Sequence, residues 1–263
     1  MKRITIAFVF ALAATFVTSG QQRPLLTDDV DITTQGSLQI GVGVDFFQKA
    51  KFPLSGINGD LTRVGDIRIR TGFSSNVELQ IEGTLQTYVA INSRTPSAIP
   101  LNLDGNSTND FDDITISAKV KLRSETRLLP SVGLKFGFQM PNTDQARGIG
   151  TNQINVFSKI LLQKKFGDTV DSTPKFNALG NLGLQIMTAP LERFTQNDVV
   201  LYGLAGTYRA TDRINIVGEV NGRVNTRSGD APRAELSLAA VSAAQARHVG
   251  RPRGRRRGRR GLS

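Results

Sequence analysis

Two neighbouring stretches of the chain alternate apolar and polar residues with a period of two. The first is Ile114–Arg123, the second is Ser131–Met140, and residues 124–130 (Ser-Glu-Thr-Arg-Leu-Leu-Pro) separate them. A period of two places successive side chains on opposite faces of a β-strand. The pattern therefore predicts two strands joined by a turn, each with one apolar and one polar face.

Similar stretches recur over most of the chain. The predicted strands are Leu38–Phe46, Val64–Arg70, Val77–Ile91, Ile114–Arg123, Ser131–Met140, Gln153–Leu162, Phe176–Met187, Asp198–Tyr208, Arg213–Val224 and Ala234–Ala240. Many have a length of about ten residues, which suits a tilted strand that crosses a bilayer better than a strand of a soluble sandwich.

The predicted connections alternate in length along the chain. Long connections are expected at Gln48–Asp60, Asn92–Asp110 and Pro141–Asn152, and short ones at Thr71–Asn76 and Ser124–Leu129, with Lys164–Lys175 longer than the alternation allows. This alternation is typical of a chain that runs up and down with tight turns at one end. We predict an all-β fold, an up-and-down antiparallel transmembrane β-barrel.

A soluble β-sandwich is the alternative, because alternation alone does not show whether an apolar face meets a protein core or lipid. The N-terminus favours export. Lys2 and Arg3 precede the apolar run Ile4–Val17, and small residues follow up to Gly20. This order is that of a secretory signal peptide, and the run is too short for a membrane-anchoring helix. We expect residues 1–20 to be the signal peptide, and we expect the chain to reach the outer membrane of a Gram-negative cell through the secretory pathway.

Composition excludes several chemistries. The chain has no cysteine, and its single histidine is His248, so Ser-His-Asp and Cys-His catalysis are not expected. The net charge of +11 belongs mostly to the two ends of the chain, since residues 233–263 hold nine arginines and one acidic residue. We therefore predict no enzyme activity, no cofactor, no metal and no binding of nucleic acid by the central region.

Several short motifs carry a resemblance to a known family. They are Arg23-Pro24-Leu25-Leu26-Thr27-Asp28-Asp29, Gly36-Ser37-Leu38, Gly65-Asp66-Ile67, Asp112-Asp113-Ile114, Leu129-Pro130, Pro141-Asn142-Thr143, Gly148-Ile149-Gly150-Thr151 and Asn181-Leu182-Gly183. Over residues 23–232 the chain resembles the phenol-degradation meta-pathway (MetA-pathway) outer-membrane family, often labelled transporters. The resemblance implies a barrel of roughly a dozen strands, of which about ten are present here, and the barrel-assembly machinery as a partner.

The sequence departs from that family at its end. Residues 233–263 are rich in Ala, Arg and Gly and contain no Asp, Asn, Ile, Phe, Thr, Lys or Tyr. We interpret this shift as a truncated or frame-shifted C-terminus that lacks the closing strands; a genuine basic tail that binds anionic lipid, lipopolysaccharide or nucleic acid is the alternative. The expected organisation is a periplasmic N-terminal segment over residues 21–37, an incomplete barrel over 38–232, and a disordered basic tail over 233–263.

Charged residues alternate with the apolar ones and mark the face that would line a lumen. The candidates are Arg68, Arg70, Glu78, Glu82, Lys119, Lys121 and Lys135. Rings of mixed charge set the selectivity of a pore, although hydration of the lumen and salt bridging would also explain them. Across the turn at residues 124–129, we expect Lys119 to lie beside Lys135.

Two acidic clusters could offer oxygen ligands to Ca²⁺, but neither has the spacing of an EF-hand loop. One contains Asp28, Asp29 and Asp31; the other contains Asp104, Asn106, Asn109, Asp110, Asp112 and Asp113. We expect solvated loop carboxylates at both. The sequence thus predicts an outer-membrane channel or passive transporter for a small solute. The alternative is a structural or surface-interaction barrel with a plugged lumen, whose loops at Asn92–Asp110 and Pro141–Asn152 bind a partner.

Overall fold

The computed structural model describes a chain made almost entirely of β-strands. It covers residues 25–52, 54–103, 105–150, 152–170, 173–187, 197–211, 214–225 and 233–242. The strands are β1 (Leu38–Phe52), β2 (Ile57–Gly72), β3 (Val77–Arg94), β4 (Ser107–Asp110), β5 (Ile114–Arg123), β6 (Ser131–Met140), β7 (Asn155–Val170), β8 (Thr173–Met187), β9 (Asn197–Arg209), β10 (Ile214–Asn225) and β11 (Arg233–Ser242). A single turn of 3₁₀ helix, η1 (Gln145–Arg147), lies between β6 and β7. Within these residues, no helix has the length and apolar content needed to cross a bilayer.

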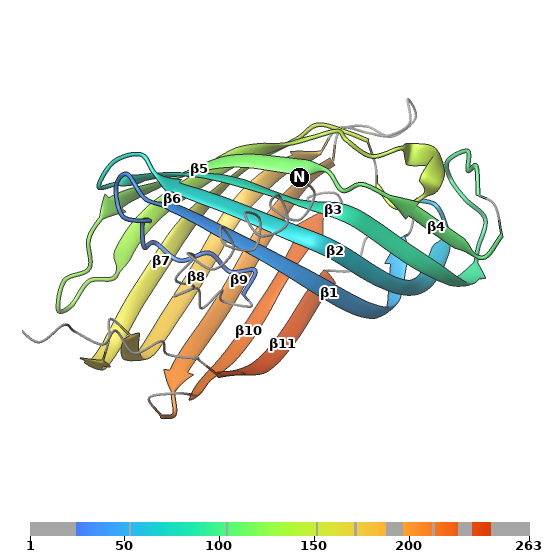
Figure 1. The fold of residues 1–263 in the computed structure, drawn as a ribbon. Helices are drawn as coiled ribbons and strands as arrows, with labels where there is room; N and C mark the ends of the chain where they lie inside the picture. The colour runs from blue at the N-terminus through green and yellow to red at the C-terminus, as the bar shows by residue number, and fades with distance from the viewer. Residues whose placement is uncertain are drawn as a thin grey trace, which may run out of the picture.

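The strands form one 11-stranded sheet whose spatial order follows the chain from β1 to β11, with β4 attached to β3 outside this path. Each strand on the path pairs antiparallel with the next. Figure 1 shows that the sheet curls into a half-barrel in which β1–β6 and β7–β11 form two facing walls. The predicted all-β, up-and-down antiparallel fold is confirmed.

Cross-strand register keeps the two faces of the sheet distinct. Ile81 pairs with Ile116, and Ile116 pairs with Phe138, so apolar side chains share one face across β3, β5 and β6. On the other face of the same strands, Glu78 pairs with Lys119, and Lys119 pairs with Lys135. Since the side-chain period of a strand is two, this register fixes the face of every residue along these strands.

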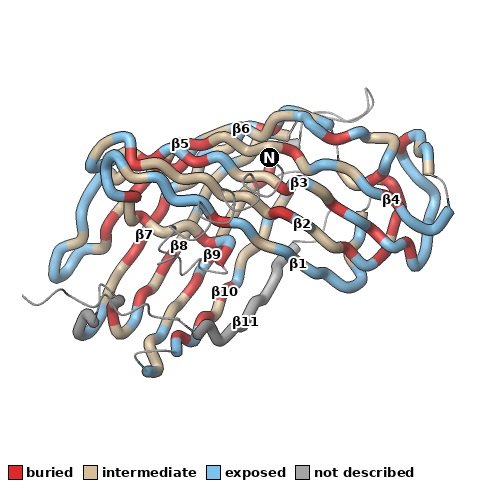
Figure 2. Tube along the Cα trace, viewed as in Figure 1, coloured by how far each residue is buried: buried red, intermediate tan, exposed pale blue. Residues whose placement is uncertain are grey.

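Burial follows the curl of the sheet (Figure 2). Many large apolar side chains on the outer face are exposed, including Val42 (68%), Leu182 (59%) and Leu204 (69%). Polar side chains on the inner face are buried instead, among them Glu78, Lys119, Lys135, Gln163, Asn177 and Glu219. This is the reverse of the distribution in a soluble protein, where charged residues are rarely fully buried.

Strands are longer, and two connections shorter, than the sequence predicts. The expected connection Lys164–Lys175 is wrong, because β7 continues to Val170 and β8 begins at Thr173. Phe166 pairs with Phe176 across these strands, and their ring centroids lie 6.0 Å apart. This aromatic pair extends the ladder through polar residues that have low strand preference by themselves.

The long loop expected at Gln48–Asp60 is also wrong. Strand β1 continues to Phe52 and β2 begins at Ile57. The ladder shifts register between Phe47 and Ala50, where Lys49 adopts a left-handed backbone conformation with φ of 55°. The bulge accommodates the polar residues at this point without ending the strand.

Strand structure also continues beyond Pro232, into the part of the chain expected to be a disordered basic tail. Strand β11 pairs with β10 from Arg233 to Ser242, so the disorder expected from residue 233 onward is wrong for these ten residues. The strand predicted at Ala234–Ala240 is confirmed. The predicted signal peptide and residues 243–263 lie outside the described residues.

Candidate functional site

Residues 25–35, which we call the inner segment, cross the inner face of the sheet. Backbone amides of the inner segment donate hydrogen bonds to side chains on three distant strands. Leu26 N donates to Glu219 on β10 (3.0 Å), Val30 N to Gln163 on β7 (2.9 Å), and Thr33 N to Glu78 on β3 (2.5 Å). A short extended segment can reach all three strands only from inside the curl. The sequence predicts residues 21–37 as a periplasmic segment before the barrel, and the structure instead places this part of it against the inner wall.

Three aspartates of the inner segment pair with a row of lysines on β5, β6 and β7. Lys119 Nζ lies 3.0 Å from Asp29 Oδ1, and Lys165 Nζ lies 2.8 Å from Asp31 Oδ1. Asp28 uses both of its carboxylate oxygens, with Oδ1 2.9 Å from Lys135 Nζ and Oδ2 3.1 Å from Lys159 Nζ. All three carboxylates are bound by lysines; the solvated state expected for them is wrong for Asp28 and Asp29, whose side chains are 14% and 15% exposed, whereas the side chain of Asp31 is 40% exposed. Among the described residues, no group of three or more His, Asp or Glu side chains is placed to hold a metal ion.

Two of these lysines are almost fully enclosed. The side chains of Lys119 and Lys135 are 3% and 4% exposed. Each also has a glutamate of the sheet as a partner, with Lys119 3.3 Å from Glu78 and Lys135 3.5 Å from Glu82. Removing one partner of a buried ion pair leaves an uncompensated charge and costs about 3–5 kcal/mol. The inner face is thus a charge-balanced network rather than a set of independent surface groups.

The remaining lumen candidates lie on the same inner face. Arg70 is 4.0 Å from Glu82, and Arg68 is 3.1 Å from Asp66. Lys121 is half-buried two residues beyond Lys119 on β5, and no ion pair joins it to the network within the described residues. The predicted neighbours Lys119 and Lys135 are direct cross-strand partners. Of the seven candidates, the network thus contains Glu78, Glu82, Lys119, Lys135 and, at its margin, Arg70.

The start of the inner segment is held by Glu219. This carboxylate accepts hydrogen bonds from Leu26 N, from Thr27 N (2.5 Å) and from the Thr27 hydroxyl, and its residue is 3% exposed. Gly203 on β9 lies directly beneath Thr27, where an added Cβ would be only 2.6 Å from Thr27 Oγ1. Glycine at this position is what allows the inner segment to approach the sheet so closely.

Asp28 is fixed by its backbone as well as by its charge. With its amide oxygen and nitrogen assigned from the surrounding hydrogen-bond pattern, the Asn181 side chain donates to Asp28 O (3.0 Å) and accepts from Asp28 N (2.6 Å). Burial alone would raise the pKa of Asp28, but the charges of Lys135 and Lys159 outweigh it and hold the pKa of this carboxyl well below its usual range. The Asp28 carboxylate therefore remains ionised at any physiological pH.

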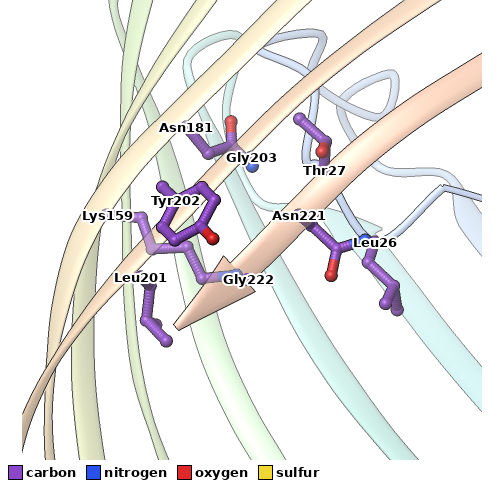
Figure 3. A pocket seen from close by; sticks show the side chains of 9 residues that line it. All are labelled: Leu26, Thr27, Lys159, Asn181, Leu201, Tyr202, Gly203, Asn221 and Gly222. Atoms are coloured by element: carbon purple, nitrogen blue, oxygen red, sulfur yellow. The ribbon is translucent and has the colours of Figure 1, made fainter. Parts of the chain in front are cut away.

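A small cavity of about 130 Å³ adjoins the inner segment (Figure 3). Its lining includes Leu26 and Thr27 from the inner segment, Lys159 from β7, and Asn181 and Asn221 from β8 and β10. The Asn221 Nδ2 atom is buried and has no hydrogen-bond partner. The lining thus joins an apolar side chain to a cation and amide groups, a combination that suits a small polar solute.

The second acidic cluster includes Asp113, which holds the loop that follows β6 by hydrogen bonds. Asp113 is buried and accepts hydrogen bonds from Gln139 Nε2 (3.2 Å), Asn142 N (3.0 Å) and Thr143 Oγ1 (3.0 Å). The solvated carboxylate expected here is therefore wrong for Asp113. Its role is structural, since it links β5 to the loop that follows β6.

Four residues that contact the inner segment were not among the candidates predicted from the sequence. They are Lys159, Gln163, Lys165 and Glu219. The available signal was alternation, because Lys159, Gln163 and Lys165 occupy one face of β7. Apolar Phe157 and Leu161 interrupt the polar residues on that face, which weakened the pattern.

The resemblance to the outer-membrane family depends on short motifs, and one of them contains Thr27, Asp28 and Asp29 of the inner segment. The chain matches no protein-family model, no curated protein and no solved structure, so its membership of that family stays a prediction.

Proposed function

We propose that this chain forms the wall of an outer-membrane β-barrel that acts as a channel or passive transporter for a small solute, with the inner segment as a plug. The observation that carries the proposal is the inverted distribution of side chains, with apolar residues exposed outside and charged residues enclosed inside. A lipid-facing barrel requires an apolar outer band and a polar interior.

The outer face supports contact with hydrocarbon. Leu182, Leu184 and Leu204 are each more than half exposed on neighbouring strands β8 and β9. Isolated exposed apolar residues are common on soluble proteins, but a band that continues from strand to strand marks an interaction surface. Backbone polar groups between paired strands satisfy one another, which is the condition for placing a sheet in lipid.

The inner face supports passage of a solute that is not apolar. Its charged groups lie on β3, β5, β6, β7 and β10 and are neutralised mainly by one another and by the inner segment. Displacement of the inner segment would expose this wall to water. The plug and the lumen lining are therefore two parts of one arrangement.

A permanently plugged barrel with a structural or surface-interaction role is the second candidate. Two observations favour this second candidate. Several strands bind the inner segment, and the long connections are joined to one another by hydrogen bonds. Thr108 Oγ1 donates to Arg147 O (2.9 Å), Ser55 Oγ donates to Gly148 O (2.7 Å), and Asn102 N donates to Ala146 O (2.9 Å). These contacts join three connections into a defined surface at one end of the sheet.

Conductance across a planar bilayer separates the two candidates. The full-length chain is first tested for fractionation with outer membranes and for heat-modifiable migration; a soluble monomer would contradict the membrane assignment. We then expect Asp28→Asn/Asp29→Asn/Asp31→Asn to raise the open probability relative to the wild type. Asp144→Asn, a neutralisation in the exposed loop after β6, is the matched control. If every variant inserts normally and none conducts, the channel hypothesis is wrong and the permanently plugged barrel is favoured.

A further inference from the structure

Three lysines stand side by side on the inner face. Lys119 pairs directly with Lys135, and Lys135 pairs directly with Lys159, so one cation follows another across β5, β6 and β7. Neighbouring strands are about 4.8 Å apart, and like charges placed directly opposite each other destabilise a sheet. The row is therefore tolerated only with anionic groups lying over it.

From this row we propose that the inner face binds a small organic anion with two or more carboxylates, and that Asp28 and Asp29 occupy its site as a built-in competitor. The inference deepens the proposed function and rests on it, because the solute reaches the row only through the barrel.

The carboxylate of Asp28 shows how such an anion would bind. Its two oxygens bridge Lys135 and Lys159, at 2.9 and 3.1 Å, while Asp29 takes Lys119. Two adjacent carboxylates thus bind three adjacent ammonium groups. A solute with two or three carboxylates offers the same charges at similar spacing. Charge-assisted hydrogen bonds of this type are among the strongest available to a polar ligand.

The sheet itself supplies carboxylates to only part of the lysine row. Lys119 and Lys135 have Glu78 and Glu82 as partners, whereas the ion pairs of Lys159 and Lys165 within the described residues are made with the inner segment. With the inner segment displaced, the four lysines and Arg70 would face the three carboxylates of Glu78, Glu82 and Glu219. The vacated wall would therefore carry net positive charge and attract an anion.

The connection between the inner segment and the barrel allows displacement without the loss of a strand. Among the residues that the structure describes, a single isolated bridge, Gln35 with Gly72, joins the inner segment to the sheet ladder. Gly36 follows with φ of 74°, a left-handed conformation that suits a hinge. The inner segment is thus attached mainly through side chains, and an anion in solution can replace the contacts that its aspartates make with the lysines.

The cavity beside Lys159 supplies room for the rest of the solute. Lys159 lines the cavity and also holds Asp28, so an anion at this lysine would extend into a space of about 130 Å³. The unpartnered Asn221 Nδ2 adds a hydrogen-bond donor there. Cation and donor lie on the same side of the inner segment (Figure 3).

Binding of citrate to the full-length protein in detergent tests this inference without requiring conductance. We expect Asp28→Asn/Asp29→Asn/Asp31→Asn to bind citrate about tenfold or more tightly than the wild type, since a tethered competitor acts at millimolar effective concentration. Lys159→Gln in the same background should abolish the gain. Asp144→Asn is the matched control and should bind citrate as the wild type does. Far-ultraviolet circular dichroism establishes that each variant is folded.

A second arm keeps the test decisive if the aspartate variants fold poorly. Thr27→Cys/Gly203→Cys fixes the inner segment when oxidised, and citrate binding should then disappear and return on reduction. Equal binding of citrate by oxidised and reduced protein, or tighter binding of pyrophosphate or spermidine than of citrate, would overturn the proposal. Citrate binding without conductance would refute the proposed channel function but not the anion site. Conductance without any effect of citrate would refute the anion site alone.

Discussion

Thr27 Cβ lies 3.5 Å from the position that a Cβ on Gly203 would occupy. Paired Cβ atoms in natural disulfides are about 3.5–4.5 Å apart, so this geometry suits a cross-link between the inner segment and β9. The chain contains no other cysteine that could compete.

The first prediction is that Thr27→Cys/Gly203→Cys forms an intramolecular disulfide under mild oxidation. The expected result is a protein whose inner segment resists proteolysis in the oxidised state and becomes more sensitive on reduction. Non-reducing electrophoresis after limited digestion with proteinase K, which cleaves after apolar residues such as those of the inner segment, measures this. The control is Leu162→Cys/Gly180→Cys, whose Cβ atoms would be 3.9 Å apart on the neighbouring strands β7 and β8, away from the inner segment. Equal protection by both cross-links would contradict the placement of the inner segment.

The second prediction concerns Glu219, which accepts hydrogen bonds from Leu26 and from Thr27. Glu219→Gln should weaken docking of the inner segment by about 1.5–3 kcal/mol, because hydrogen bonds to a buried charged acceptor contribute on this scale. Hydrogen exchange at residues 25–33 should become faster while exchange in β5 and β6 stays unchanged. Asp144→Asn removes a loop carboxylate and should alter neither. Uniformly faster exchange over the whole sheet would instead mean that Glu219 supports the barrel itself.

The third prediction is a pH dependence set by Asp28, whose pKa is lowered because Lys135 and Lys159 outweigh the effect of burial. Its ordinary pKa in an unfolded chain is about 3.9. A lowered pKa in the folded state stabilises docking fully above that value, and the contribution is lost as pH falls through the folded pKa. The inner segment should therefore stay protected from pepsin at pH 4 and become sensitive only at lower pH.

Lys159→Gln provides the comparison for this titration. With one of the two neighbouring cations removed, the pKa of Asp28 should rise, and sensitivity to pepsin should begin at a higher pH than in the wild type. An unchanged onset would show that Asp28 does not govern release of the inner segment.

The fourth prediction tests the outer face. Leu182 lies within β8 and is 59% exposed, so Leu182→Arg would place a cation where the proposal puts lipid. The expected cost to insertion is about 2–4 kcal/mol near the bilayer midplane. Thr211→Arg, in the turn between β9 and β10, should have little effect. Folding titrations into lipid vesicles measure both. A soluble protein would tolerate either change within about 0.5 kcal/mol, so equal behaviour of the two variants would contradict the lipid contact.

Local periodicity was sufficient to predict most of the strands and the hairpin that brings Lys119 beside Lys135. Both depend on residues near each other in the sequence, where a period of two determines the face and a short turn determines the partner. Strand ends were harder to predict. The aromatic pair between Phe166 and Phe176 extends β7 and β8 into residues that have the composition of a loop.

The position of the inner segment could not be predicted in the same way. Asp28 and Lys135 are 107 residues apart in sequence, and Leu26 and Glu219 are 193 apart. Neither pair belongs to a periodic pattern or to a turn. Clustered aspartates are equally suited to a calcium site, to a solvated loop or to a lysine row, and only the curl of the sheet brings the lysines within reach.

This separation has a consequence for how the protein assembles. Each strand of the sheet pairs with its neighbour in the chain, so successive hairpins can form as local events with low loop-closure entropy. Leu26 and Thr27 cannot dock by a local event of this kind. Their acceptor is Glu219 on β10, the next-to-last strand of the sheet, so they can dock only after almost all of the sheet has formed. Leu26 and Thr27 thus reach their native positions late in folding, and their docking requires that the strands around them have already formed.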